Sequence, residues 1–144
     1  MYLTQNFSLD ELTASQTAAR RNIDNTPPTD LVENLRAVAS LLEDTRRLLG
    51  HPLLISSGYR SPELNELIGG NISSQHCKGQ AADFICPKFG TPYEVADAIA
   101  RSNIAFDQLI YEGTWCHISW SETPRHEVLT ARFRPIRYER GLHR

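Results

Sequence analysis

A single long amphipathic helix is the feature that most constrains the fold of this chain. Asp30 and Glu33 stand where acidic side chains favour the start of a helix. Apolar residues follow at helical spacing, and Gly50 suits the left-handed turn that ends many helices. The apolar positions are Leu31, Leu35, Val38, Leu41 and Leu42. The pattern predicts a helix between Asp30 and Gly50.

Capping residues predict three shorter helices. Ser8 and Glu11 have the spacing of a capping box, in which two side chains satisfy the free N–H groups of a helix start. A hydroxyl residue followed by proline, at 61–62 and again at 91–92, is typical of a helix N-terminus. The three helices are expected to begin at Ser8, to run from Ser61 to about Ile68, and to run from Thr91 to about Arg101.

Strand signals follow the long helix, and Gly113-Thr114 is expected to form the turn of a hairpin. Helices first and strands later predict an α+β fold, with the helices packed on a small antiparallel sheet. We expect one domain over residues 1–144, with its functional motifs in 53–120. The predicted strands are Leu53–Ser56, Ala81–Ile85, Gln108–Glu112, Cys116–Trp120 and Val128–Phe133.

Length and charge argue against several classes of protein. A chain of 144 residues suits one compact domain, and a net charge of −2 gives no bulk attraction to nucleic acid or membranes. No apolar run approaches the roughly 20 residues that cross a bilayer. The opening residues lack the basic and apolar regions of a secretory signal, so we expect synthesis in the cytoplasm.

The C-terminal part is basic, with six arginines against three glutamates from Ser121 onward. Residues from about 134 to 144 are expected to form a tail. Such a tail is either a solvated end or a segment that touches an anionic polymer.

Two histidines and an aspartate could hold a metal ion. Catalytic zinc takes three protein ligands from His and carboxylate side chains and leaves a fourth position open. His76 and Asp83 lie seven positions apart, and the small residues between them let the backbone pack closely. His117, on the second strand of the predicted hairpin, would be the third ligand. The spacing alone leaves another interpretation open, in which each histidine is a satisfied polar residue.

The hairpin supplies a geometric argument about Glu112. A two-residue turn at 113–114 places Glu112 opposite Trp115, and residues 115 and 117 share one face of a strand. Glu112 and His117 therefore project to the same side. Glu112 is a candidate general base, or else a solvated glutamate at a strand end.

Arg60 lies in a polar turn between a predicted strand and a predicted helix. It could steady a carboxylate or a developing oxyanion, or it could be a surface arginine. The three cysteines are an odd number, which argues against a disulfide framework. Cys77 and Cys116 each follow or precede a candidate ligand directly, so in extended backbone they would point away from the metal.

Three motifs together resemble a known family. They are S-G-Y-R-S at 57–61, S-x-H-x-x-G-x-A-x-D at 74–83, and W-x-H at 115–117. In this order they resemble the zinc peptidases that cut peptidoglycan stem peptides, the D-alanyl-D-alanine carboxypeptidases and dipeptidases and the L-alanyl-D-glutamate endopeptidases of peptidase family M15. The opening segment is similar to that of phage and prophage members.

The resemblance implies one Zn²⁺ ion on His76, Asp83 and His117, with Arg60 at the substrate end of the cleft. It also implies a catalytic acid shortly before the last histidine. Several members carry this acid two or three positions ahead, where this chain has Trp115 and Thr114, so the role passes to Glu112.

The substrate-binding residues are expected to be Arg60, Tyr59, Ser74, Gln75 and Trp115, with Trp120 as a further groove wall. The aromatic ones among them could equally belong to the core.

We expect a monomeric hydrolase that acts on the peptidoglycan stem peptide, delivered to the cell wall by a phage or prophage as endolysins are. Two alternatives stay open: a non-catalytic, zinc-stabilised module that binds cell wall or a phage structural protein, and an unrelated fold with structural histidines.

Overall fold

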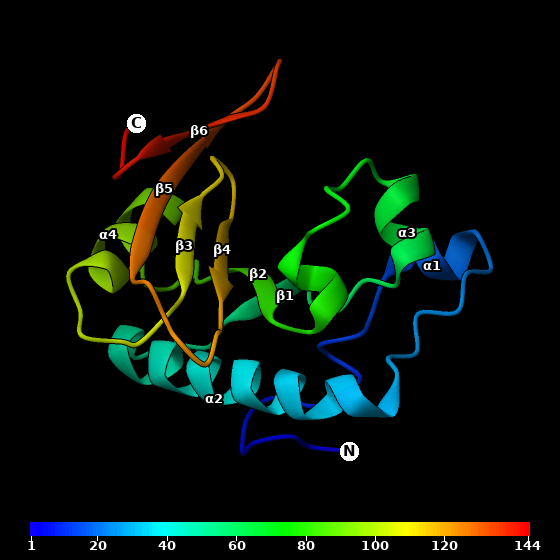
Figure 1. Cartoon of the computed structure of the whole chain (residues 1–144). Coiled ribbons are helices and arrows are strands. Elements are labelled where there is room, and N and C mark those ends of the chain that lie inside the picture. Colours follow the sequence, from blue (N-terminus) through cyan, green and yellow to red (C-terminus); the bar gives the residue numbers. More distant parts are fainter.

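The computed structural model describes all 144 residues, and a six-stranded sheet with helices around it forms its centre (Figure 1). The helices are α1 (Gln16–Arg20), α2 (Val32–Leu49), α3 (Pro62–Leu67) and α4 (Pro92–Ala100), with 3₁₀ turns η1 (Thr29–Leu31) and η2 (Gln75–Lys78). The strands are β1 (Leu54–Ser57), β2 (Ala81–Ile85), β3 (Gln108–Tyr111), β4 (Cys116–Ser119), β5 (Glu127–Arg132) and β6 (Arg137–Arg140). The predicted α+β class is confirmed.

Helix α2 is the predicted long helix, and it spans the base of the molecule (Figure 1). Its apolar stripe is buried, with Leu35, Val38 and Leu42 fully inaccessible to solvent. Gly50 ends the helix in the left-handed conformation at φ 72°, where the missing Cβ avoids strain. Helix α4 contacts both α2 and the sheet, so the core lies between these two helices and one face of the sheet.

The expected cap-and-proline starts are present at α3 and α4. The hydroxyl of Ser61 accepts a hydrogen bond from Leu64 N, and that of Thr91 accepts one from Glu94 N. The Glu94 side chain completes a capping box by accepting from Thr91 N. No helix of the structure combines the length and apolar character that a bilayer crossing requires.

The sheet has the order β1-β2-β4-β3-β5-β6 and is mixed, not wholly antiparallel as expected. Strand β4 ends beside the first residues of β3. The connection at 120–126 passes the start of β3 and reaches its other side, so β5 runs parallel to β3. All other neighbouring strands are antiparallel.

Two local expectations were wrong. Ser8 and Glu11 do exchange capping hydrogen bonds, but they close a series of turns and no helix forms there. The carbonyl of Leu12 accepts from Tyr59 N at 2.8 Å, which diverts it from a helical ladder. The first helix is α1, capped by Ser15. The expected basic tail contains β6, which pairs with β5 and extends the sheet.

Candidate metal centre

His76, Asp83 and His117 come together from three different elements. His76 lies on η2, Asp83 on β2 and His117 on β4, and Asp83 is directly opposite His117 in the antiparallel register. Asp83 Oδ1 lies 3.1 Å from His117 Nδ1 and 3.2 Å from His76 Nε2. All three side chains are buried, and their possible ligand atoms lie within 4.8 Å of one another.

The turn that carries His76 is fixed at both ends. Ser74 caps η2, because its hydroxyl accepts from His76 N at 3.1 Å. Gly79 ends the turn at φ 66°, where it packs against α2. A Cβ there would lie 3.2 Å from the carbonyl oxygen of Leu31. The small residues that follow on β2 are fully buried. The close packing expected of this segment is therefore present.

A carbonyl group orients the His76 ring. His76 Nδ1 lies 2.7 Å from the carbonyl oxygen of Gly58, so Nδ1 carries the proton and donates it. Nε2 is then the free nitrogen, and it faces Asp83. Ligand histidines in metal sites are typically fixed in this way through their second ring nitrogen. Gly58 itself has no room for a side chain, because a Cβ would lie 2.2 Å from the carbonyl oxygen of Leu12.

The ionisation states at this site suit a metal ion. Burial lowers the pKa of His76 by more than the neighbouring Asp83 raises it, so the imidazole is neutral at neutral pH. Burial alone would raise the pKa of Asp83, but the adjacent His76 ring and a hydrogen bond from His117 hold it well below its usual range. Neutral imidazoles and an ionised carboxylate are the forms that bind divalent metals. The donor set could therefore hold one such ion.

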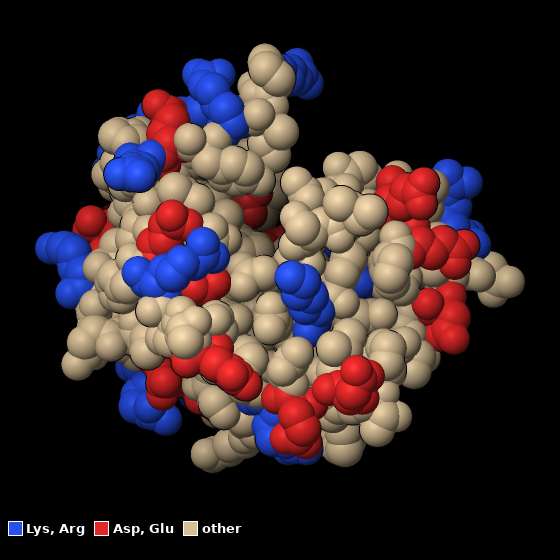
Figure 2. Space-filling view, in the orientation of Figure 1, with Lys and Arg blue, Asp and Glu red and all other residues tan.

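Glu112 lies on the same side of the sheet, at the turn between β3 and β4. Its N–H donates to the carbonyl oxygen of Trp115 at 3.0 Å, which is the two-residue turn that the sequence predicts. The indole Nε1 of Trp115 donates to Glu112 Oε2 at 3.1 Å. Burial, and then the negative charge of Asp83, raise the pKa of Glu112 above that of an ordinary glutamate. Figure 2 shows a hollow with acidic atoms in its floor between the β5–β6 hairpin and the part of the molecule that carries α3.

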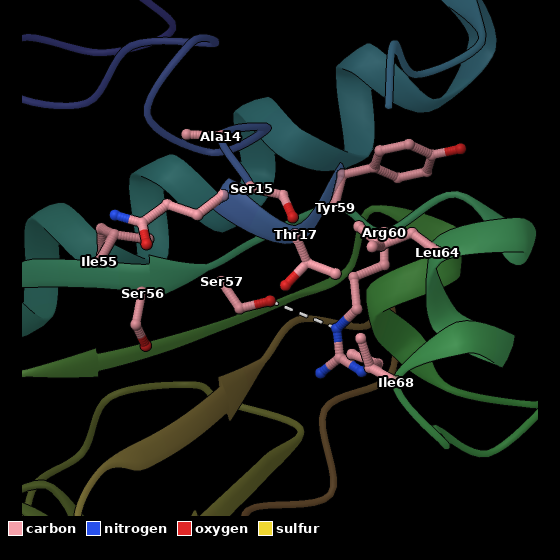
Figure 3. A pocket seen from close by; sticks show the side chains of 11 residues that line it. Ala14, Ser15, Thr17, Ile55, Ser56, Ser57, Tyr59, Arg60, Leu64 and Ile68 are labelled. Atoms are coloured by element: carbon pink, nitrogen blue, oxygen red, sulfur yellow. Dashed lines mark hydrogen bonds between the residues drawn. The ribbon is translucent and has the colours of Figure 1, made fainter. Parts of the chain in front are cut away.

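Arg60 lies on the other side of Asp83 and is held in place by polar groups. Its Nη1 donates to Asn65 Oδ1 at 3.0 Å, its Nε donates to Ser57 Oγ at 3.3 Å, and its Nη2 lies 3.7 Å from Asp83 Oδ2. A pocket of about 540 Å³ opens beside it, between β1, α3 and the start of α1 (Figure 3). Hydroxyl side chains line much of this pocket: Ser15, Thr17, Ser56 and Ser57.

The other expected substrate residues have varied positions. Tyr59 is only 3% exposed, packs in the core and points away from the Arg60 guanidinium (Figure 3). It therefore fits the alternative that the aromatic residues belong to the core. Ser74 is a cap, and Gln75 donates from Nε2 to Asp107 Oδ2 at 3.0 Å. Trp115 borders Glu112. Trp120 is partly buried against the core.

The cysteines take no part in the group of ligands. Cys116 Sγ donates to the carbonyl oxygen of Pro92 at 3.2 Å, on the α4 face of the sheet. Burial raises the pKa of this thiol to about 12. The opposite orientations expected for Cys116 and His117 are confirmed. The three cysteines are all free thiols.

Three positioning residues were missed by sequence reasoning. Gly58 accepts from His76, Asn65 holds Arg60, and Asp107 holds Gln75. Asn65 and Asp107 are buried polar residues, and no local spacing signals their partners. Gly58 lies within the S-G-Y-R-S motif, so its position could have been singled out by the close backbone approach that glycine permits.

In a comparison with protein families, residues 5–119 match the model described as Peptidase M15. The matched segment contains every member of the candidate site. A search among curated proteins gives no significant match. The model covers most of the chain and includes the buried His-Asp-His group. The chain therefore belongs to the peptidase M15 family.

Proposed function

We propose that this protein is a zinc peptidase that hydrolyses D-amino-acid-containing stem peptides of peptidoglycan, as a carboxypeptidase or an endopeptidase. One observation carries the proposal. In a member of a metallopeptidase family, two buried histidines and a buried aspartate converge beside a glutamate with a raised pKa. This combination supports metal-assisted hydrolysis.

The proposed zinc ligands are His76, Asp83 and His117. Two imidazoles and one carboxylate are a donor set that catalytic zinc uses, with a further position left for water or substrate. When bound, zinc would supply a Lewis acid and a water whose pKa is lowered to about 7. The carbonyl of Gly58 fixes the tautomer that presents His76 Nε2 to the ion.

Glu112 is the proposed general base. Its Oε2 accepts from the Trp115 indole, so Oε1 is the oxygen free to accept a proton from the attacking water. The same carboxyl then returns the proton to the leaving amine. The raised pKa brings Glu112 closer to neutral pH, which suits a group that must both accept and release a proton.

Arg60 is proposed to orient the substrate and to offset negative charge. Its guanidinium borders both Asp83 and the hydroxyl-lined pocket. A carboxylate of the peptide, or the oxyanion formed at the scissile carbonyl, can accept charge-assisted hydrogen bonds from it. The contacts with Asn65 and Ser57 hold the guanidinium ready for this contact.

The proposal is tested by incubating zinc-loaded protein with purified muropeptides and analysing the products by mass spectrometry. We expect new products whose masses identify the bond cut. Glu112→Gln should keep its zinc and lose activity by a factor on the order of 10² or more. If the parent with one zinc bound cuts no muropeptide but still binds it, the protein is a zinc-stabilised binding module instead.

Delivery to the cell wall by a phage or prophage is part of the same proposal. Its support is the similarity of the opening segment to phage members of the family.

A further inference from the structure

The β5–β6 hairpin lies outside the segment that the family model matches, yet it borders the candidate site. It spans residues 127–140 and rises above the rest of the sheet (Figure 1), whereas the match ends at residue 119. The hollow with acidic atoms in its floor lies against this hairpin (Figure 2). A role for this hairpin in holding the peptide rests on the proposed peptidase function.

The strand register places Tyr138 on the face of the sheet that carries the metal ligands. Asp83 is opposite His117, His117 is opposite Ile110, and Ile110 is beside Leu129. Residues directly paired across strands share a face, and so do residues two apart on one strand. Ala131 follows Leu129 by two positions and is opposite Tyr138.

Tyr138 and Glu112 are separated by a small residue. The parallel register pairs Tyr111 with Thr130, so Glu112 comes next to Ala131. Tyr138 lies on the other side of Ala131, about 10 Å from Glu112 across two strand spacings. An alanine between them leaves the space above the sheet open to the tyrosine ring. Partial burial, and then the charges of Glu112 and Asp83, raise the pKa of Tyr138, as expected if its hydroxyl lies toward the site.

Two further aromatic side chains, Trp115 and Phe133, come from the turn between β3 and β4 and the turn between β5 and β6. The rings of Trp115 and Phe133 lie 6.3 Å apart at 44°, and the Trp115 indole is bound to Glu112. Phe133 and Tyr138 are large and about half exposed, with Tyr138 at 53%. We name Trp115, Phe133 and Tyr138 the aromatic wall. It stands on the Glu112 side of the cleft, opposite Arg60.

The hairpin is also positively charged. Arg132 is paired with Glu139, whereas Arg134 and Arg140 form no salt bridge. Arg140 lies opposite Leu129 and so shares the face of Tyr138. Basic atoms border the upper end of the hairpin (Figure 2). Arginine binds carboxylates through paired, charge-assisted hydrogen bonds. The charge therefore complements a peptide that carries free carboxylates.

We propose that the β5–β6 hairpin forms one wall of the substrate cleft, where Tyr138 packs against the bound peptide and the unpaired arginines favour peptides with free carboxylates. The hairpin would then determine affinity and selectivity, while the residues at the metal centre carry out hydrolysis.

The test compares Tyr138→Ala and Tyr138→Phe with the zinc-loaded parent on a soluble muropeptide. Tyr138→Ala should raise KM about 10-fold and change kcat by less than about 3-fold, because a binding contact is lost while the reacting groups stay. Tyr138→Phe should lie nearer the parent if ring packing dominates. Tyr2→Ala is the matched control, because Tyr2 is 70% exposed near the N-terminus, far from the hairpin (Figure 1). Zinc content and Tm should be unchanged in all three variants.

Calorimetric binding separates this inference from the proposed function. The dissociation constant for uncleaved muropeptide is measured in a Glu112→Gln background with and without Tyr138→Ala. Weaker muropeptide binding after Tyr138→Ala supports the hairpin as a wall of the cleft, even if the parent does not cleave. If the protein cleaves muropeptides and KM and Kd are the same with and without Tyr138, the hairpin is not a wall of the cleft. The proposed peptidase function would still stand. A parent that neither binds nor cleaves muropeptides overturns both.

The arginines are tested with a muropeptide whose carboxylates are amidated. The parent should bind the free acid more tightly than the amide. Arg140→Gln should reduce this preference, because Arg140 lies opposite Leu129 and shares the face of Tyr138. Arg47→Gln, on the exposed side of α2, should leave it unchanged. An unchanged preference in Arg140→Gln and in Arg134→Gln would show that these arginines do not bind the peptide carboxylates.

Discussion

Asp83 and His117 lie directly opposite each other on neighbouring antiparallel strands, with Asp83 Oδ1 3.1 Å from His117 Nδ1. The register of β2 and β4 therefore brings together two candidate ligands that are 34 positions apart in the sequence. A shift of the register by one residue would turn one of them to the α4 face. The metal centre thus depends on the pairing of two short strands.

Metal binding should raise the thermal stability of the protein. The ligand atoms converge only in the folded chain, so an ion that binds them favours the native state. At 100 times its Kd, zinc is expected to add about 2.7 kcal/mol, which raises Tm by several degrees. The measurement is a thermal scan with EDTA and then with added zinc. Asp83→Asn should show little of this gain, and a full gain in that variant would exclude Asp83 as a ligand.

Gly58→Ala should destabilise the protein more than a typical glycine substitution. The new Cβ would lie 2.2 Å from the Leu12 carbonyl oxygen, so the backbone must move. We expect a loss of at least about 2 kcal/mol in the free energy of unfolding. The control is Gly50→Ala, where no atom lies within 4 Å and only the left-handed conformation is strained, at about 1 kcal/mol. Denaturant unfolding measures both.

Gly58→Ala should also weaken zinc binding, because the Gly58 carbonyl fixes the His76 ring. Loss of a contact of this kind typically costs 10- to 100-fold in metal affinity. Competition with a chromophoric chelator measures the affinity. Unchanged affinity in a destabilised Gly58→Ala protein would mean that this hydrogen bond does not support the site.

Trp115→Phe should shift the pH dependence of activity. The Trp115 indole donates to the Glu112 carboxylate and so lowers the pKa of Glu112. Phenylalanine keeps an aromatic ring but removes the donor, so this pKa rises. Because a general base must be deprotonated, the acidic limb of kcat/KM should move to higher pH. A profile that keeps its acidic midpoint would show that the limb reports another group.

Asp107 should contribute stability that is lost in acid. Hydrogen bonds from the Arg125 side chain lower the pKa of this buried carboxyl, and a hydrogen bond from Gln75 lowers it further. Together they outweigh burial, which by itself would raise the pKa. A group whose folded pKa is lowered stabilises the protein above its unfolded pKa of about 3.9 and loses that effect as the pH falls through the folded value. Asp107→Asn should therefore be less stable than the parent at pH 6, by about 1–3 kcal/mol, with a smaller difference near pH 3.

Urea unfolding of both proteins at the two pH values measures this effect. A gap that is as large at pH 3 as at pH 6 would contradict the assignment, because the charge of Asp107 would then have no part in it.

Local patterns in the sequence predicted most of the elements. Strand β2 begins and ends where expected, the long helix ends at Gly50, and the hairpin places Glu112 opposite Trp115. Each of these rests on neighbours in the chain: helical spacing, a capping residue or a tight turn. The convergence of the ligands was expected from the motif order, and the structure places them together.

Strand pairings and contacts between distant segments could not be predicted from local sequence patterns. The parallel pairing of β3 and β5 depends on where a connection crosses the sheet, and nothing local to β5 records this. The pattern around Arg137 is polar and exposed, so β6 lacks the alternation that marks a half-buried strand. Tyr59 is held by a contact with a distant segment, since its N–H donates to the carbonyl oxygen of Leu12, and a single sequence does not show this.

We propose that His76, Asp83 and His117 hold one zinc ion. Native mass spectrometry of protein purified without an affinity tag and exposed to zinc tests it most directly. We expect about one zinc per chain in the parent and in Glu112→Gln, and none in the variant with Asp83 and His117 both changed to Ala. Less than about half an equivalent in the parent, or full occupancy in the double variant, would contradict it.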